Sequence, residues 1–328
     1  ISTIHSYCQQ VVRQNFQRCG VDPQFMLADE RTRAGYWQDA MEETLDWLYG
    51  AAHEDAELAD LTHKFSEREI TLMMETLYRF LMSRPDPMAW LEQSAGKVWT
   101  TEAMDEEPLA RTFCREAALI LEGMDALWRE ADAMRTHAAF PPPYLLTLQS
   151  DRGTIDGLRA ACEAGMSALC RALGTLKFVT LGRFKPTTGD EERLAADFKD
   201  LRSRIKDMAD ELKKLLPADF EQGVADMQAM SPATQGLAKA VRHFHECFLF
   251  RKLGEACIDF GDLEHMTLAV LRDPDLRKQQ AQRFDAVFVD EYQDVSDLQE
   301  AIIQKVARPG RLFMVGDVKQ SIYRFRLA

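Results

Sequence analysis

The chain has 328 residues, of which 46% are apolar and 28% charged, and its formal net charge is −13 at pH 7. These values are typical of an ordinary globular protein with two domains, or with one domain that carries a large insertion. No apolar run approaches the ~18 residues of a membrane span, no signal-peptide-like leader is present, and the acidic charge argues against a protein that coats nucleic acid nonspecifically.

The cysteines and the two chain ends give further expectations. The seven cysteines are odd in number, are never spaced Cys-x-x-Cys, and mostly stand among apolar residues with helical spacing. We interpret them as reduced core thiols of an intracellular protein. The chain opens on ISTIHSYC without an initiator Met and closes on YRFRLA just as a helical pattern begins. We therefore expect it to be a fragment of a longer protein.

From about residue 22 to residue 256 the pattern predicts one helix after another. Clusters of Pro, Gly, Ser and Thr punctuate this block. They predict breaks between helices at residues 140–144, 181–190 and 230–236. No internal repeat or low-complexity tract is present.

Two of these helices have clear start and stop signals. Ser66 and Glu69 form a capping box at the start of one helix, which Pro85 ends. The other extends from Asp190, the expected N-cap, to Pro217 and carries a heptad seam. We expect this seam to pack on another helix of the same chain. Its apolar positions are Leu194, Phe198, Leu201, Ile205, Met208, Leu212 and Leu215.

After residue 256 the pattern changes to strands and helices in alternation. A strand is expected at Phe284–Val289, a helix at Val295–Ala307 and a second strand at Arg311–Val315. Continuous apolar strands with short connections to a helix are typical of a parallel α/β sheet. As a hypothesis, we assign the first twenty residues to the same α/β domain.

Acidic residues follow the first predicted strand in the stretch FDAVFVDEYQD. Asp290 and Glu291 lie at the carboxyl end of a parallel strand, where ligands of open α/β sheets bind. Nucleotide hydrolysis needs one carboxylate near Mg²⁺ and a second to orient and deprotonate the attacking water. A helix N-terminus would also stabilise these acids, and the pattern alone leaves both interpretations open.

The second predicted strand also ends in polar residues, at a Gly316–Asp317 turn followed by Gln320. A Gln at a neighbouring strand end can hydrogen-bond a terminal phosphate. The aromatic and basic side chains that come next can stack bases and hold phosphates of single-stranded nucleic acid, or pack in a core. They are Tyr323, Arg324, Phe325 and Arg326.

A metal-dependent nuclease is a rival interpretation. Asp290 or Asp294, followed by Asp317 and Lys319, superficially matches the acid and Asp-x-Lys arrangement in which Lys activates water beside a metal. That chemistry requires Asp317 and Lys319 on a strand, whereas Gly316 and the polar run after it favour a turn. A His243-x-His245 metal site is also disfavoured, because positions i and i+2 of a helix do not share a face.

Taken together, VDEYQD and VGDVKQSIYRFR resemble motifs II and III of the superfamily 1 DNA helicases of the UvrD/RecB group. The form GDVKQSIYRFRLA is most similar to the AddA type of helicase–nuclease, and ISTIHSYC resembles the Thr-Ile-His-Ser-Phe-Cys motif of the same proteins. The resemblance implies an incomplete P-loop (RecA-like) α/β motor domain interrupted by a large all-α insertion. Its expected boundaries are 1–20 and 256–328 for the motor domain and 21–255 for the insertion.

For the ATP site, the resemblance implies one role for each matching residue. Asp290 would hold Mg²⁺, Glu291 would be the general base for ATP hydrolysis, and Gln320 would sense the γ-phosphate. Gln293 and Arg326 would couple the ATP and DNA sites. The chain departs from the family pattern in having Val where Thr commonly follows the acidic motif, which changes no proposed catalytic role.

For DNA, the resemblance implies two contact segments. Thr3, His5 and Ser6 would contact the strand near the start of the chain, and Tyr323 and Phe325 would stack bases near its end. In this family, ATP hydrolysis drives 3′→5′ movement along single-stranded DNA. A passive platform for single-stranded DNA or a partner protein is the alternative.

One family element is absent from the sequence. No G-x-x-x-x-G-K-[ST] loop occurs, so the phosphate-cradling Lys is missing and we expect the chain alone not to hydrolyse ATP. The resemblance implies that the parent protein works in a bacterial double-strand-break repair complex in the cytoplasm. It also implies two kinds of partner, which are single- or double-stranded DNA and a second, AddB-type protein of the complex.

Overall fold

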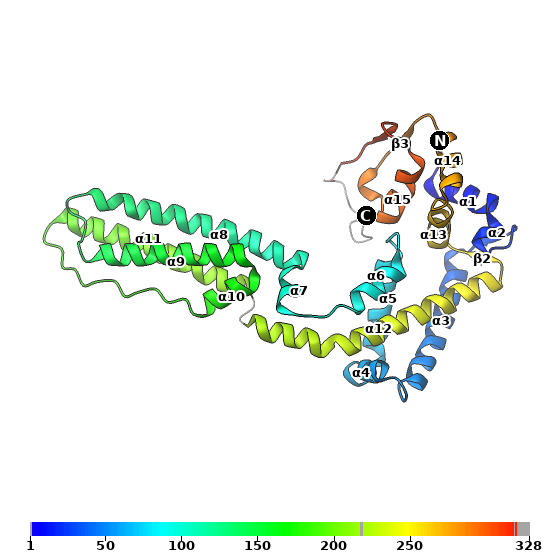
Figure 1. Cartoon of the computed structure of the whole chain (residues 1–328), viewed down its shortest axis with the longest axis horizontal. Helices are drawn as coiled ribbons and strands as arrows, with labels where there is room; N and C mark the ends of the chain where they lie inside the picture. The colour runs from blue at the N-terminus through cyan, green and yellow to red at the C-terminus, as the bar shows by residue number, and fades with distance from the viewer. Residues whose placement is uncertain (1, 217–218, 318, 320–328) are drawn as a thin grey trace. The chain divides into compact units, whose positions relative to one another are not determined.

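The computed structural model describes residues 2–216, 219–317 and 319. The packing divides the chain into two compact units, one of residues 1–97 and 230–328 and one of residues 98–229. Most described residues are helical and few are in strands, as expected (Figure 1). The domain boundaries implied by the family resemblance at residues 20 and 255 remain a prediction, because compact packing and family domains need not divide a chain at the same points.

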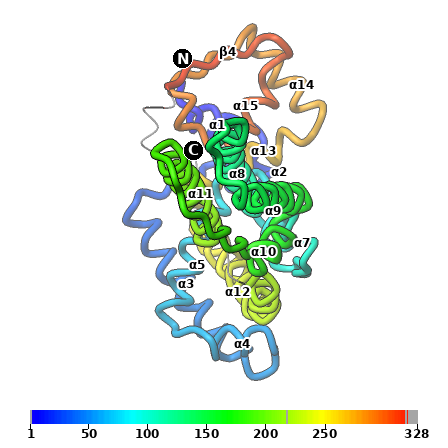
Figure 2. Tube along the Cα trace, turned by 90° about the vertical axis from the view of Figure 1, so that its left-hand side faces the viewer, coloured from blue at the N-terminus to red at the C-terminus, as the bar shows by residue number. Residues whose placement is uncertain are grey.

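The unit of residues 98–229 is a bundle of long helices that lie side by side (Figures 1 and 2). Helices α8 and α11 pack against each other, as do α8 and α9. Leu121, Met124, Ile155, Ile205 and Leu212 are among the side chains that fill its core. The helices are α7 (Thr101–Asp105), α8 (Pro108–Ala133), η1 (Met134–Thr136), α9 (Tyr144–Ala164), α10 (Met166–Gly174) and α11 (Gly189–Leu215).

Helix α11 confirms the heptad seam but corrects its N-cap. The seam packs on α8 of the same chain, with Met208 and Leu215 less buried than the other seam residues. The N-cap is Thr188, not Asp190, because the Thr188 hydroxyl accepts from the Glu191 N–H at 3.2 Å. The Glu191 carboxylate accepts in return from the Thr188 N–H at 3.3 Å, which completes a capping box. Pro217, the expected stop, lies outside the described residues.

The second unit contains a helical part that has its own core. Its helices are α3 (Glu30–Ala51), α4 (Ala56–Lys64), α5 (Glu67–Leu81), α6 (Pro87–Ala95) and α12 (Phe220–Gly254), which begins in the other unit. The predicted capping box of Ser66 and Glu69 is present at the start of α5. The predicted break at residues 230–236 is wrong, since Pro232 lies inside α12. An interior Pro costs about 3 kcal/mol, and burial of the apolar face of α12, with Phe244 and Phe248 fully buried, outweighs this cost.

The α/β part of the same unit contains two small parallel sheets. Strand β1 (Met26–Leu27) pairs with β2 (Cys257–Ile258), and β3 (Val287–Val289) pairs with β4 (Leu312–Met314). The strand–helix–strand prediction is therefore confirmed, with shorter elements than expected. The helices of this part are α1 (Ile4–Gln14), α2 (Phe16–Cys19), α13 (Phe260–Val270), α14 (Pro274–Gln282), η2 (Tyr292–Asp294) and α15 (Asp297–Val306).

The start and the end of the chain share one core, as the hypothesis for the first twenty residues requires. Cys8 and Val12 of α1 pack with Leu263 of α13 and with Leu298 and Ile302 of α15. All seven cysteines are free thiols. Among the described residues, no helix has the length and apolarity needed to cross a membrane.

Candidate functional site

Asp290 and Glu291 are the first residues after strand β3, and both side chains are exposed. Helix α15 starts at Asp297 with Ser296 as its N-cap, so neither acid lies in its first turn. The interpretation that the dipole of α15 stabilises these two carboxylates is therefore not supported, because the effect falls off within the first turn. A ligand remains the better explanation for their position at the strand end.

The backbone of Glu291 adopts a left-handed conformation, with φ 52° and ψ 41°. A residue with a side chain pays a conformational cost there, and such residues cluster at functional sites. The turn is held by its own hydrogen bonds: the Glu291 N–H donates to Asp290 Oδ1 at 3.0 Å, and the Tyr292 N–H donates to the Val315 carbonyl at 2.9 Å. The pKa of Tyr292 is raised, first by its hydrogen bond to Glu300 and then by burial.

Gln293 joins the ends of the two strands. Its Nε2 donates to Glu291 Oε2 at 2.5 Å, and its Oε1 accepts from the Asp317 N–H at 2.9 Å. Gly316 lies directly against Gln293, where a β-carbon would meet Gln293 Oε1 at 2.6 Å. The segment after β3 and the segment after β4 are thus fixed relative to each other.

The carboxylates of this turn fit a magnesium ion with its nucleotide. Mg²⁺ prefers hard oxygen ligands and is usually held by one or two carboxylates, with waters and substrate phosphates completing its shell. Asp290 and Glu291 each use one oxygen within the turn, and no ion pair to either occurs within the described ranges. The buried Oδ1 of Asp294 also has no hydrogen-bond partner in that part of the chain. No described group of three His, Cys, Asp or Glu residues could hold a metal by itself, so phosphate ligands would be needed.

The structure does not place Asp317 and Lys319 as the nuclease interpretation requires. Strand β4 ends at Met314, and Asp317 follows in a turn whose Oδ1 accepts from the Lys319 N–H at 3.0 Å. The strand that would present both side chains to a metal is absent at this position. The remaining predicted residues of this region lie outside the described residues: Gln320, Tyr323, Phe325 and Arg326.

The predicted DNA-contacting residues near the start of the chain lie at the N-terminus of helix α1. Thr3 is the N-cap, and its hydroxyl accepts from the Ser6 N–H at 3.2 Å. The Thr3 and Ser6 hydroxyls are exposed and lie 2.9 Å apart. Hydroxyls beside the free N–H groups of a helix N-terminus are suited to phosphate oxygens of a nucleic acid.

His5 connects this segment to the acidic one. Its Nε2 lies 3.0 Å from Oε1 of Glu264 on α13, and the same oxygen accepts from Gln299 Nε2 at 2.7 Å. Gln299 is in the first turn of α15, which follows the acidic segment. The two predicted functional segments near opposite ends of the chain are therefore joined through one buried carboxylate.

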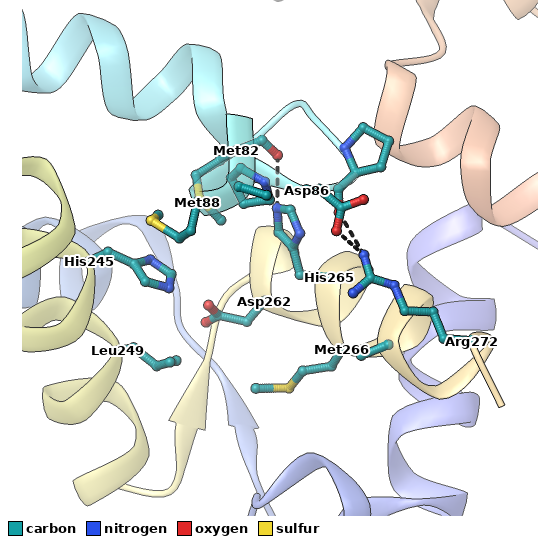
Figure 3. A pocket seen from close by; sticks show the side chains of 13 residues that line it. Met82, Asp86, Met88, His245, Leu249, Asp262, His265, Met266 and Arg272 are labelled. Atoms are coloured by element: carbon teal, nitrogen blue, oxygen red, sulfur yellow. Dashed lines mark hydrogen bonds and ion pairs between the residues drawn. The ribbon is translucent and has the colours of Figure 1, made fainter. Parts of the chain in front are cut away.

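A cavity of about 330 Å³ lies elsewhere in the same unit, between the α5–α6 turn, α12 and α13 (Figure 3). Its walls are mostly apolar, and His245, Asp262 and His265 face it. None of the predicted site residues lines it. His243, the other residue of the His-x-His pair, instead stacks on Trp47, with ring centroids 4.1 Å apart.

Comparison with known families places the whole chain in one of them. The model of the UvrD/REP helicase N-terminal domain matches residues 1–328. The chain belongs to this family. The resemblance inferred from the three motifs is thereby confirmed.

Similar full-length proteins are known for this UvrD/REP helicase chain, and they carry the name of the A component of an ATP-dependent helicase/nuclease. The one from Geobacillus kaustophilus is 36% identical over 350 residues, which cover 100% of the chain and 28% of the relative. Proteins of the same name from Syntrophomonas wolfei and Geobacillus thermodenitrificans are 31% and 35% identical, also over 100% of the chain and over 27% and 28% of their own lengths. The chain thus spans just over a quarter of the relatives that it matches.

Two residues of this UvrD/REP site were not identified from the sequence. Glu264 stands in the stretch IDFGDLEHM, which predicts only a loop and a short helix. Gln299 looks like an ordinary capping-box residue of α15. The one usable signal is that Glu264 follows Leu263 on a largely apolar helix, where a buried acid needs a partner.

Proposed function

We propose that the chain is part of the first motor domain of an ATP-dependent DNA helicase of the AddA type, with ATP and Mg²⁺ as cofactors. The observation that carries the proposal is the acidic turn after β3. Its two carboxylates are exposed, and Gln293 joins it to the end of β4. The names of the relatives support an ATP-dependent helicase with a partner protein in its complex for the full-length protein.

Within this site, Asp290 would hold Mg²⁺ and Glu291 would accept the proton of the attacking water. Bound Mg²⁺ neutralises charge on the phosphate oxygens. Gln293 holds Oε2 of Glu291, which leaves the other carboxylate oxygen for the water. The proposal assigns γ-phosphate sensing to Gln320. Gln293 and Arg326 would couple this site to DNA.

The DNA strand would contact Thr3, His5 and Ser6, with its bases stacked on Tyr323 and Phe325. The exposed hydroxyls at the N-terminus of α1 support the first of these contacts. We further propose 3′→5′ movement on single-stranded DNA, a bacterial cytoplasmic double-strand-break repair complex, and an AddB-type partner protein. These details follow from the family resemblance.

The small β3–β4 sheet supports a larger motor domain in the full-length protein. Parallel sheets are usually covered on both faces, yet Phe288 is 75% exposed and Phe313 is 59% exposed. Their rings are 5.9 Å apart and form an uncovered apolar face. We propose that other elements of a P-loop (RecA-like) sheet cover this face and supply the phosphate-binding Lys, so that the present chain alone is inactive.

Substitution of Glu291 by Gln in the full-length protein tests the proposed function. Loss of the general base should lower kcat for ATP hydrolysis by about 100-fold or more, while single-stranded DNA still binds. A passive DNA- or partner-binding module predicts unchanged ATP hydrolysis in the same variant. Mg²⁺-dependent DNA cleavage without ATP, abolished by Lys319→Ala, would favour the nuclease instead.

A further inference from the structure

Glu264 is a buried carboxylate that contacts both predicted functional segments. It is 7% exposed on helix α13, and its Oε1 lies 3.0 Å from His5 Nε2 and 2.7 Å from Gln299 Nε2. A carboxylate without such partners would be costly at this depth, and charge-assisted hydrogen bonds are about twice as strong as neutral ones. The two contacts therefore both satisfy Glu264 and restrain the side chains that make them.

On one side, Glu264 restrains the predicted DNA-contacting segment. The His5 ring also lies against Phe260, the first residue of α13, with ring centroids 4.5 Å apart. Held by these two contacts, the His5 side chain is still 38% exposed. His5 follows Thr3 by two residues, so a fixed His5 ring also fixes the position of the exposed hydroxyls at the N-terminus of α1.

On the other side, Glu264 restrains the start of helix α15. Gln299 forms the capping box of this helix with Ser296, two residues after the acidic segment ends. The turn after α5 makes a second attachment, in which the Leu298 N–H donates to the Ser83 carbonyl at 2.9 Å. The start of α15 is thus held from two directions, and a displacement of the acidic segment would pull directly on Gln299.

We propose that Glu264 is a positioning residue that couples the state of the ATP site to the grip on DNA. It would do so by holding His5 and Gln299 through a single oxygen atom. The inference rests on the proposed function and adds a coupling residue to it. An apolar residue at position 264 would leave both donors without their acceptor, whereas Gln would still offer a carbonyl oxygen.

The test uses the full-length protein in its complex, oligo(dT) as the DNA probe, and DNA-stimulated ATP hydrolysis as the readout. For Glu264→Leu we expect the oligo(dT) concentration at half-maximal stimulation to rise about tenfold, the loss of one hydrogen bond to a charged group. Glu264→Gln should shift it less than about threefold. The exposed Glu255, changed to Gln, is the control for loss of a carboxylate and should shift nothing.

This readout separates positioning from mere structural support. A variant that only folds less well has fewer active molecules, which lowers the maximal rate and leaves the half-saturating oligo(dT) concentration unchanged. That result for Glu264→Leu would overturn the inference. If this variant does not fold, Gln299→Leu breaks the same connection from α15, and an unchanged half-saturating concentration in folded Gln299→Leu protein would overturn the inference equally.

A double substitution and a reference variant complete the design. His5→Ala and Glu264→Leu should together shift the oligo(dT) requirement no more than the larger single effect, whereas full additivity would contradict a shared connection. Glu291→Gln is measured alongside. If Glu291→Gln retains ATP hydrolysis, the proposed function fails; if it abolishes hydrolysis while Glu264→Leu behaves like Glu255→Gln, only the coupling inference fails.

Discussion

Gly316 lies so close to Gln293 that the chain has no room for a side chain at this position. A β-carbon on Gly316 would be 2.6 Å from Gln293 Oε1 and 3.0 Å from the Gln293 backbone nitrogen. Real β-carbons do not approach other atoms within 3.0 Å, and the backbone nitrogen cannot turn away as a side-chain end can. The hydrogen bonds through which Gln293 joins the two strand ends therefore depend on the glycine.

Gly316→Ala should accordingly impair ATP hydrolysis in the full-length protein. Displacement of Gln293 releases Glu291 Oε2, and misplacement of a catalytic group by about 1 Å costs about 100-fold in rate. We expect kcat to fall about 10- to 100-fold, as measured by steady-state ATP hydrolysis with saturating DNA. Gly254→Ala is the control, since its added β-carbon meets no atom within 4 Å. Equal rates for the two variants would contradict this account.

Gly236 in helix α12 should resist a substitution that usually stabilises helices. Ala is favoured over Gly in a helix interior by about 1 kcal/mol. Here the new β-carbon would lie 2.4 Å from the carbonyl oxygen of Glu57 and 2.9 Å from its carbonyl carbon, and overpacking costs about 1–3 kcal/mol. We expect Gly236→Ala to lower the free energy of unfolding by about 1–2 kcal/mol in urea titrations.

Gly35→Ala in helix α3 is the matched control for that experiment. Nothing lies within 4 Å of its β-carbon, so only the helix propensity acts. It should raise the free energy of unfolding by about 0.5–1 kcal/mol. The same sign of change in both variants would show that the contact with Glu57 is not decisive.

The buried pair Arg202–Asp151 should be sensitive to loss of either partner. Arg202 is 5% exposed and donates from Nε to Asp151 Oδ2 at 2.6 Å and from Nη2 to Oδ1 at 3.1 Å. Removal of one partner leaves a buried charge uncompensated, which costs about 3–5 kcal/mol. Arg202→Met should lower the free energy of unfolding by this amount.

The double variant Arg202→Met, Asp151→Leu tests the cause of that loss. Replacement of both partners by apolar residues removes the uncompensated charge, so much of the stability should return in urea unfolding. The recovery should be incomplete, because Arg202 Nη2 also donates to the Val179 carbonyl at 2.7 Å. No recovery at all would locate the effect in packing instead of charge.

Acid should destabilise the chain through His245. Burial lowers the pKa of this imidazole from 6.5 to about 4, with the Lys252 charge as a smaller cause. In the unfolded chain it titrates near 6.5, so the unfolded state binds more protons as the pH falls from 6.5 to about 4, and stability is lost in this window. At pH 5 the penalty is about 2 kcal/mol relative to pH 7.

His245→Phe should remove this dependence and is measured against the unchanged chain at both pH values. The variant loses the hydrogen bond of Tyr78 to His245 Nδ1 at 3.1 Å, a constant cost. Its disadvantage at pH 7 should shrink by about 2 kcal/mol at pH 5. Asp262 beside the same cavity (Figure 3) acts in the opposite direction: burial raises its pKa to about 6, so it gains stability as the pH falls from about 6 to 3.8. This gain is common to both proteins and cancels in the comparison.

Local patterns were sufficient for several elements of the fold. The capping box of Ser66 and Glu69, the heptad seam of α11 and the parallel strand–helix–strand unit all follow from contacts within one or two turns or from strict periodicity. The N-cap of α11 was wrong by two residues, because Thr188 and Asp190 are both good caps and only the side-chain geometry selects one. The break at Pro232 was wrong because tertiary burial of α12 outweighs the local preference of Pro.

The sequence by itself determined which kind of chemistry the chain can take part in: the acids after β3, the hydroxyls of Thr3 and Ser6, and the family to which they belong. Only the tertiary structure decided which of these groups lie together. Glu264 reaches His5 across more than 250 positions of the chain, and Gly316 meets Gln293 across a pair of strands. Such contacts depend on how helices and strands pack in three dimensions, and neither periodicity nor local propensity contains that information.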